Sequence, residues 1–126
     1  MKKAKKSLSQ NFINDKNICN KILNQVTIKD KKIIEIGPGY GFLTDLIIKR
    51  NPSNLLLIEK DNELCNLLKE KYIKLKNIYI QNIDAIDFDY KTYKNQIIIS
   101  NLPYNQSSKI ILNFFKYNQN INEMVF

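Results

Sequence analysis

The strongest constraint on the fold is a short apolar segment that leads through a glycine-rich turn into a helix. The apolar segment covers residues 32–36, and the turn after it contains the chain's three glycines, Gly37, Gly39 and Gly41. Apolar residues then recur at helical spacing over residues 42–50, until Asn51 and Pro52 end the pattern. Because glycine adopts backbone conformations that other residues avoid, such a turn lets the main chain approach a ligand closely. The sequence therefore predicts a strand, a ligand-binding or structural turn, and a helix.

This turn is not the fingerprint of a dinucleotide site. The pattern G-x-G-x-x-G requires its third glycine at position 42, which is Phe42, and the chain has no Gly-Lys-Ser/Thr for a P-loop. By itself, a glycine-rich turn after a strand is nearly as compatible with a structural role as with ligand binding. The interpretation as a binding site therefore depends on residues further along the chain.

Strand and helix patterns continue to alternate downstream. Further strands are expected at residues 55–58, 78–80 and 97–100, with a fifth beginning at Met124. Helices are expected from Asn14 or Asp15 to about Val26, from Asp61 or Asn62 with Leu64, Leu67, Leu68 and Tyr72 facing inward, and after Ser107 and Ser108. The alternation predicts an α/β fold with a mostly parallel sheet and helices on both faces, of which about the first four to five strands are present.

Composition limits the classes of function. A chain of 126 residues suits one domain, and its 20 Lys and Arg against 12 Asp and Glu give a net charge of +8, which favours a polyanionic partner. Ile, Lys and Asn are abundant throughout, so part of the lysine excess reflects compositional bias. No segment has the apolar length of a membrane span or of a signal peptide. We therefore expect a soluble, cytoplasmic protein without a membrane partner.

The rarer residues exclude several chemistries. The chain has no histidine, and Cys19 and Cys65 are isolated, so we expect neither a metal site nor a disulfide and place both cysteines in the core. The absence of histidine also removes Ser and Cys triads. Methyl transfer from a sulfonium donor survives this exclusion, because the positive sulfur already activates the methyl group and the protein mainly aligns the reactants.

Two carboxylates lie at the ends of expected strands, where they could bind a nucleoside ligand. Glu59 ends the second strand, about 20 residues after the turn, where a carboxylate is placed to bind two ribose hydroxyls; the alternative is an ordinary exposed Glu beside Lys60. Asp84 follows the third strand and is placed to accept a hydrogen bond from an adenine amino group, although an Asx turn would also explain it. Glu35 and Asp61 are weaker candidates, since either fits a strand-edge or helix-cap carboxylate.

The segment Asn101-Leu102-Pro103-Tyr104 follows the fourth apolar run directly. An amide, a proline and an aromatic ring then stand at the carboxyl end of a strand, where open α/β sheets bind ligands. An adenine amine is a poor nucleophile because its lone pair is delocalised into the ring. The amide oxygen of Asn101 and a backbone carbonyl could localise that lone pair while Tyr104 stacks on the base. The alternative is a strand followed by a proline turn.

Five motifs in this order resemble the ribosomal RNA adenine dimethyltransferase family. They are Ser9-Gln10-Asn11-Phe12, Glu35-Ile36-Gly37-Pro38-Gly39-Tyr40-Gly41-Phe42-Leu43-Thr44, Glu59-Lys60-Asp61, Asp84-Ala85 and Asn101-Leu102-Pro103-Tyr104-Asn105. The resemblance implies a Rossmann-like class I methyltransferase fold and S-adenosylmethionine-dependent dimethylation of adenine exocyclic amines in ribosomal RNA. It also implies a role for each motif residue.

By this resemblance, Asn11 and Ile13 lie against the methionine end of S-adenosylmethionine, where the family commonly has leucine in place of Ile13. The turn glycines Gly37, Gly39 and Gly41 cradle the donor, Glu59 binds its ribose and Asp84 its adenine. Asn101 marks the transfer point, with Leu102, Pro103 and Tyr104 completing the catalytic motif.

The resemblance also suggests which branch of the family the chain is similar to and how much of a family member it covers. Leu102 and residues 105–108 are more similar to the small-subunit housekeeping branch than to the large-subunit antibiotic-resistance branch. Family members continue into further strands and a helical RNA-binding domain. Residues 1–126 are therefore expected to be the N-terminal part of the methyltransferase domain, with those later regions absent. A monomer is the favoured oligomeric state. A glutamine methyltransferase and a non-catalytic RNA-binding assembly factor remain the alternatives.

Overall fold

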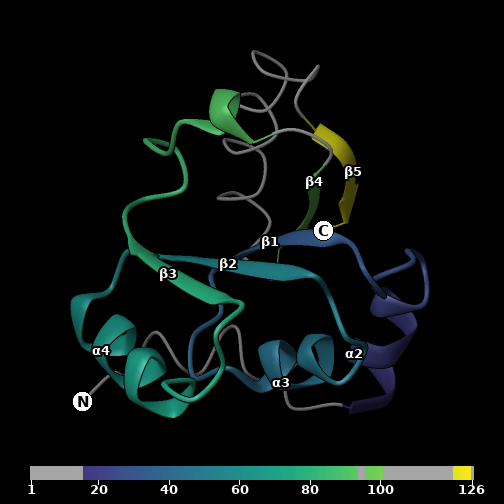
Figure 1. Cartoon of the computed structure of the whole chain (residues 1–126), viewed down its shortest axis with the longest axis horizontal. Coiled ribbons are helices and arrows are strands. Elements are labelled where there is room, and N and C mark those ends of the chain that lie inside the picture. The colour runs from purple at the N-terminus through teal and green to yellow at the C-terminus, as the bar shows by residue number, and fades with distance from the viewer. Residues whose placement is uncertain (1–15, 94–95, 101–120, 126) are drawn as a thin grey trace.

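The computed structural model describes residues 16–93, 96–100 and 121–125. Its centre is a five-stranded sheet in which every pair of neighbouring strands is parallel (Figure 1). The strands are β1 (Lys32–Ile36), β2 (Asn54–Glu59), β3 (Ile78–Asn82), β4 (Gln96–Ser100) and β5 (Ile121–Val125), in the spatial order β3-β2-β1-β4-β5. The predicted α/β class with a parallel sheet is confirmed, although β5 begins at Ile121 rather than at Met124.

The helices alternate with the strands in the expected order. They are α2 (Lys16–Leu23), α3 (Phe42–Ile48) and α4 (Asn62–Lys71), with a short 3-10 helix η1 (Tyr90–Thr92) before β4. Asp61 caps α4, because its side chain accepts a hydrogen bond of 3.1 Å from the amide of Leu64. Helix α2 ends at Leu23, earlier than the expected Val26. The helix expected after Ser107 and Ser108 falls outside the described residues.

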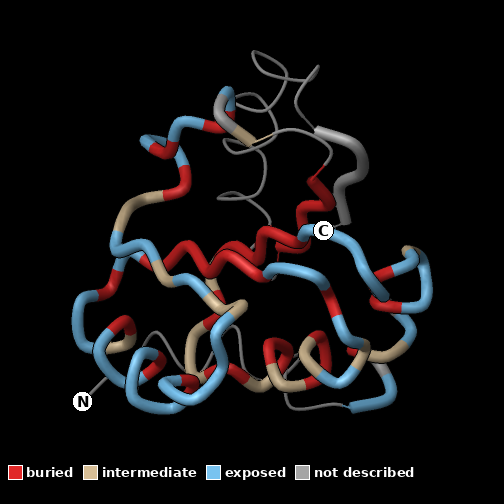
Figure 2. Tube along the Cα trace, viewed as in Figure 1, coloured by how far each residue is buried: buried red, intermediate tan, exposed pale blue. Residues whose placement is uncertain are grey.

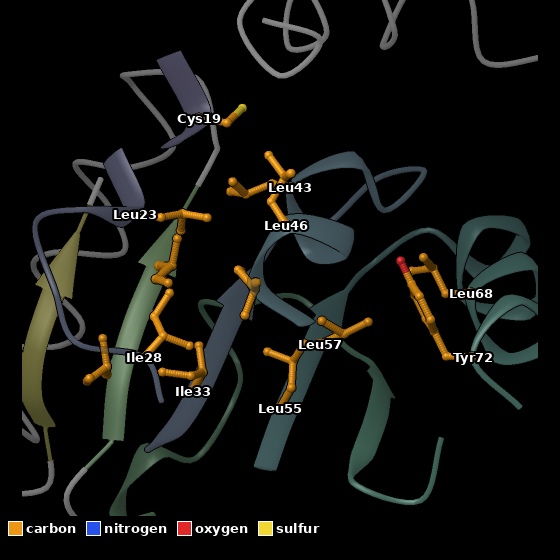
Figure 3. Close-up of a cluster of buried hydrophobic side chains, with 13 residues drawn as sticks. Cys19, Leu23, Ile28, Ile33, Leu43, Leu46, Leu55, Leu57, Leu68 and Tyr72 are labelled. Atoms are coloured by element: carbon orange, nitrogen blue, oxygen red, sulfur yellow. The ribbon is translucent and has the colours of Figure 1, made fainter. Parts of the chain in front are cut away.

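Helices α2, α3 and α4 share one face of the sheet and bury the first of two apolar cores there (Figure 3). The side chains of this core come from those helices, from the segments just after α2 and α4, and from β1, β2 and β4: Cys19, Leu23, Ile28, Ile33, Leu43, Leu46, Ile47, Leu55, Leu57, Leu68, Tyr72, Ile97 and Ile99. Right-handed crossovers from β1 to β2 and from β2 to β3 run in one direction along the sheet, so α3 and α4 lie on the same side.

One inward assignment in α4 is wrong. The helix buries Cys65, Leu68 and Tyr72, which follow each other at helical spacing, whereas Leu67 is 40% exposed at the margin of this stripe. The expected place of the two cysteines is confirmed, since Cys19 and Cys65 are both buried.

The second core lies on the opposite face, beneath the segment that returns from β3 to β4. Its members are Ile34, Ile36, Leu56, Ile58, Ala85, Phe88, Tyr90 and Ile98. Because both faces are covered, the inner strands are buried nearly throughout (Figure 2). Within the part of the chain that the structure describes, no helix is long and apolar enough to cross a membrane.

The strand order reverses at β1. From β1 the chain adds β2 and β3 on one side, then returns to place β4 against the other edge of β1. The register pairs Ile36, the last residue of β1, with Ser100, the last residue of β4. Open parallel sheets bind ligands outside the carboxyl ends of the strands at such a switch point. The residues that follow β1, β2, β3 and β4 are therefore the candidates for a site.

Candidate active site

The glycine turn lies at the carboxyl end of β1 and is joined to its neighbours by main-chain hydrogen bonds. The amide of Gly37 donates to the carbonyl of Ile58 in β2 at 2.9 Å, and the amide of Gly41 donates to the carbonyl of Pro38 at 3.0 Å. Gly39 has a φ of +61°, and a Cβ placed there would meet no atom of the described residues within 4 Å. The backbone at Gly39 therefore borders open space, which suits close approach of a ligand.

Gly41 is required for a different reason. Its φ of +90° is strained for other residues, and a Cβ there would collide with the hydroxyl oxygen of Tyr72 and approach Nζ of Lys71 to 3.1 Å. Gly41 caps α3, and its carbonyl accepts the amide of Asp45 at 2.9 Å. Position 41 is thus packed against the end of α4, while position 39 is open.

Glu59 ends β2 and is tied directly to the glycine turn. Its Oε1 accepts the amide of Gly39 at 3.2 Å, and its Oε2 accepts the amide of Asp61 at 2.9 Å. The residue is only 7% exposed, so it is not the ordinary exposed Glu that the sequence left as an alternative, whereas Lys60 is exposed. A buried carboxylate held by two backbone amides is an ordered acceptor beside the turn.

Asn82, the last residue of β3, is a part of this site that the sequence analysis missed. Its side-chain amide donates to the carbonyls of Glu59 and Lys60, each at 3.1 Å. The amide of Ile83 and the thiol of Cys65 also donate to the carbonyl of Glu59, at 3.1 and 3.2 Å. These contacts fix the end of β2 from two sides. A polar residue two positions before Asp84 was the only sequence signal for this role.

Asp84 lies just beyond β3 and forms the Asx turn that the sequence analysis weighed. Its Oδ1 accepts the amide of Ile86 at 3.0 Å. A second contact stabilises the turn, because the buried hydroxyl of Tyr90 donates to the carbonyl of Ala85 at 2.8 Å. Burial, followed by the charge of Asp84, raises the pKa of Tyr90, which keeps this hydroxyl a donor. An Asx turn uses one carboxylate oxygen, so it is compatible with a ligand at the other.

Glu35 is neither a strand-edge nor a helix-cap residue. It lies in the central strand β1 and is fully buried, with Oε1 accepting the hydroxyl of Thr44 from α3. Its Oε2 is buried and accepts no hydrogen bond from the described residues. Burial raises the pKa of Glu35 to about 8; the charges of Asp45 and Glu59 add to this effect and the bond from Thr44 opposes it. The group is therefore a neutral carboxylic acid near pH 7.

The remaining residues of the expected site fall outside the described part of the chain: Asn11, Ile13, Asn101, Leu102, Pro103 and Tyr104. The structure does bring together the glycine turn, Glu59 and Asp84 at the carboxyl edge of the sheet, and Asn101 follows Ser100 directly in sequence. Among the residues described, no cluster of His, Cys, Asp or Glu is able to hold a metal ion.

A parallel sheet of this order, with a glycine turn after β1 and an ordered carboxylate at the end of β2, is a Rossmann-like arrangement, and solved class I methyltransferases share it. Solved structures with this fold include the 23S rRNA methyltransferase ErmE, with a TM-score of 0.75, 22% identity and coverage of 87% of this chain and 45% of that one. A dimethyladenosine transferase from Plasmodium falciparum has a TM-score of 0.69 and 26% identity, covering 81% of this chain and 37% of the other.

The chain belongs to the ribosomal RNA adenine dimethylase family, whose model matches residues 1–126. It is 41% identical over 127 residues to a ribosomal RNA small subunit methyltransferase A of Hydrogenobaculum sp., covering 100% of this chain and 49% of that protein. It is 43% identical over 112 residues to the protein of the same description from Mycoplasma mobile, covering 89% of this chain and 43% of that protein. The chain thus spans less than half the length of these relatives.

Proposed function

We propose that this chain supplies the donor-binding part of an enzyme that dimethylates adenine exocyclic amines in small-subunit ribosomal RNA, using S-adenosylmethionine. The observation that carries the proposal is the buried Glu59 carboxylate, held by Gly39 and Asp61 beside the glycine turn. An ordered acceptor at the end of β2 suits a ribose with two adjacent hydroxyls. Relatives described as small-subunit enzymes support this branch over the large-subunit one.

The described residues fit the proposed donor by their chemistry. Open space at Gly39 leaves room for a ligand against the main chain, and Glu59 provides acceptors for hydroxyl groups. Asp84, just beyond β3, is the proposed partner of the donor's adenine amino group. Asn11, Ile13 and Gly37 complete the proposed binding set by resemblance to the family.

The proposed transfer step depends on the segment that follows β4. When bound, S-adenosylmethionine supplies a methyl group that its positive sulfur already activates. The side-chain oxygen of Asn101 and a main-chain carbonyl of the motif would accept hydrogen bonds from the two N–H groups of the adenine amine and localise its lone pair on nitrogen. That nitrogen would gain the methyl group as the S–CH3 bond breaks, and the amine would lose one proton to solvent. Leu102 and Pro103 would hold the motif rigid, and Tyr104 would stack on the extruded base. No histidine general base is needed for this step.

The proposed partner is ribosomal RNA in the small subunit. A net charge of +8 favours a polyanion, and phosphate contacts from lysines would supply most of the non-specific affinity. The chain contains all the residues of the proposed donor site, so donor binding is expected of it alone. Turnover is expected of a protein with the length of the relatives.

Donor binding and methyl transfer test the proposal separately. Titration calorimetry should show one S-adenosylmethionine bound per chain, and a protein of the relatives' length should transfer two methyl groups per adenine to undermethylated small subunits. RNA binding without donor binding would instead identify a non-catalytic RNA-binding factor. Methylation of a glutamine in a protein substrate, with none in RNA, would identify the glutamine methyltransferase.

A further inference from the structure

The end of α4 makes a set of contacts to the glycine turn that the proposed donor site does not itself require. The hydroxyl of Tyr72 donates to Oδ1 of Asp45 at 2.6 Å and lies 3.2 Å from the carbonyl of Gly41. The ammonium of Lys71 donates to Oδ2 of Asp45 at 3.0 Å and to the carbonyl of Tyr40 at 3.1 Å. Two successive carbonyls of the turn, those of Tyr40 and Gly41, are therefore contacted by Lys71, the last residue of α4, and by Tyr72, the residue that follows it.

We propose that Tyr72, Lys71 and Asp45 act as positioning residues that hold the glycine turn in the conformation that binds the methyl donor. We call these three residues the α4 clamp. The inference rests on the proposed function, since it assigns a purpose to the turn. It adds three residues that belong to none of the site's motifs: Asp45 in the first turn of α3, Lys71 at the end of α4, and Tyr72 just after it.

Packing shows that the clamp and the turn fit each other closely. A Cβ at Gly41 would collide with the Tyr72 hydroxyl, so Tyr72 can pack against the turn only because position 41 has no side chain. Tyr72 is 6% exposed, and Figure 3 shows it beside Leu68 at the α4 end of the first core. Burial first, and then the bond to Asp45, raises the pKa of Tyr72, so the hydroxyl stays a donor at any ordinary pH.

Tyr72 and Lys71 differ in burial and therefore in how they restrain the turn. The Lys71–Asp45 pair is partly exposed, at 37% and 44%, so as an ion pair it contributes little by itself. Its structural effect comes from geometry: Lys71 bridges Asp45 and Tyr40, and Asp45 presents its other oxygen to Tyr72. The clamp therefore restrains the turn at Tyr40 and Gly41 and leaves the open side at Gly39 for the donor.

Selective isotope labelling measures the conformational exchange of the glycine turn directly. Because the chain's three glycines are all in the turn, a chain labelled with [15N]glycine shows only the amides of Gly37, Gly39 and Gly41. Tyr72→Phe and Lys71→Met keep the ring and the aliphatic stem, so both variants should fold. We expect microsecond-to-millisecond exchange broadening at Gly41 and Gly39 in both variants. Lys69→Met, an exposed residue of the same helix, is the matched control and should leave the three signals unchanged.

Donor affinity is the second measurement. S-adenosylhomocysteine should bind about three- to tenfold more weakly to Tyr72→Phe and to Lys71→Met, as for loss of one or two hydrogen bonds, while Lys69→Met binds as the wild type does. Gly41→Ala should be worse than either, and adding Tyr72→Phe to it should restore part of the affinity because the colliding hydroxyl is gone. Such a rescue would not follow from a general loss of stability.

The outcomes separate this inference from the proposed function. Wild-type affinity and unchanged glycine signals in both clamp variants would overturn the inference while leaving donor binding intact. Lower melting temperatures with unchanged signals in the folded state would also overturn it, by showing a stabilising role only. A wild-type chain that binds no S-adenosylhomocysteine would contradict the proposed function, and the glycine signals would then decide alone whether the clamp holds the turn.

Discussion

The amide of Gly39 donates a hydrogen bond to Oε1 of Glu59, and this 3.2 Å contact joins the turn after β1 to the end of β2. The same carboxylate accepts the amide of Asp61 through its other oxygen. A carboxylate offers about four acceptor positions, so it can order the backbone and accept ribose hydroxyls at once. In the proposed function, Glu59 therefore links the shape of the glycine turn to donor binding.

Replacing Glu59 with Ala should weaken the binding of S-adenosylmethionine by roughly 1.5–3 kcal/mol, the range for hydrogen bonds to a charged group. Titration calorimetry measures the change. Glu63→Ala is the control, because it removes an exposed carboxylate from the first turn of α4 with the same change in charge. Equal affinities in folded Glu59→Ala and in the wild type would remove Glu59 from the donor site.

Asn101→Ala should reduce turnover by about a hundredfold or more, because it removes an acceptor aimed at the amine as positive charge develops. The assay is methyl transfer to undermethylated small ribosomal subunits by a protein of the relatives' length. Wild-type turnover would show that transfer does not occur at the residue that follows β4.

At Tyr104 the same assay should separate stacking from hydrogen bonding. Tyr104→Phe should be mild because the ring remains, whereas Tyr104→Ala should cost roughly 1–3 kcal/mol in holding the adenine. Equal losses in the two variants would mean that the hydroxyl, and not the ring, contacts the substrate.

The parts of the fold that the sequence predicted best were those with a local cause. Strands β1, β2 and β4 appeared as short apolar runs because both of their faces are covered, and Asp61 was identifiable as a cap from the pattern after it. The position of Glu59 followed from its place at the end of a strand.

What the sequence did not predict depends on contacts between distant segments. Glu35 looked like an edge or cap carboxylate, and only the covering of β1 by α3 shows that it is buried beside Thr44. Asn82 and Tyr72 bind carbonyls that lie 23 and 31 residues away in the chain, so no local pattern marks their partners. Leu67 and Leu68 both matched the helical period, but the orientation of α4 buries Leu68 and leaves Leu67 at the margin of the buried stripe.

The buried acid in β1 should make stability depend on pH. Glu35 has a pKa of about 8 in the folded chain and 4.5 as its ordinary value, so the folded state binds more protons between these values. Stability contributed by this group is full below pH about 4.5 and is lost as the pH rises towards 8, with a slope of about 1.4 kcal/mol per pH unit. Urea unfolding followed by circular dichroism at several pH values measures this slope.

Glu35→Gln should flatten that dependence, because the amide does not ionise. The chain has no histidine, so no imidazole titrates in the same window. Glu63→Gln, at an exposed position, should keep the wild-type slope. A slope that survives in Glu35→Gln would assign the titration to another group.

RNA affinity should fall steeply between about 50 and 200 mM salt, since each phosphate contact releases counterions. Fluorescence anisotropy with a labelled fragment of small-subunit ribosomal RNA measures the slope. Removing the lysine-rich residues 2–6 should reduce RNA affinity and leave donor affinity unchanged. A salt-independent affinity would mean that the lysine excess reflects composition and that the partner is not a nucleic acid.

The position of β1 at the reversal of strand order also bears on how the chain is made. Strand β2 follows β1 after a single helix, but the residues that pair with the other edge of β1 come about sixty residues after it. At about 5–20 residues per second, translation of that interval takes roughly 3–12 s. During this time the nascent chain carries an apolar strand with one edge unpaired, which is the period when chaperone capture or mispairing with another chain competes with native folding.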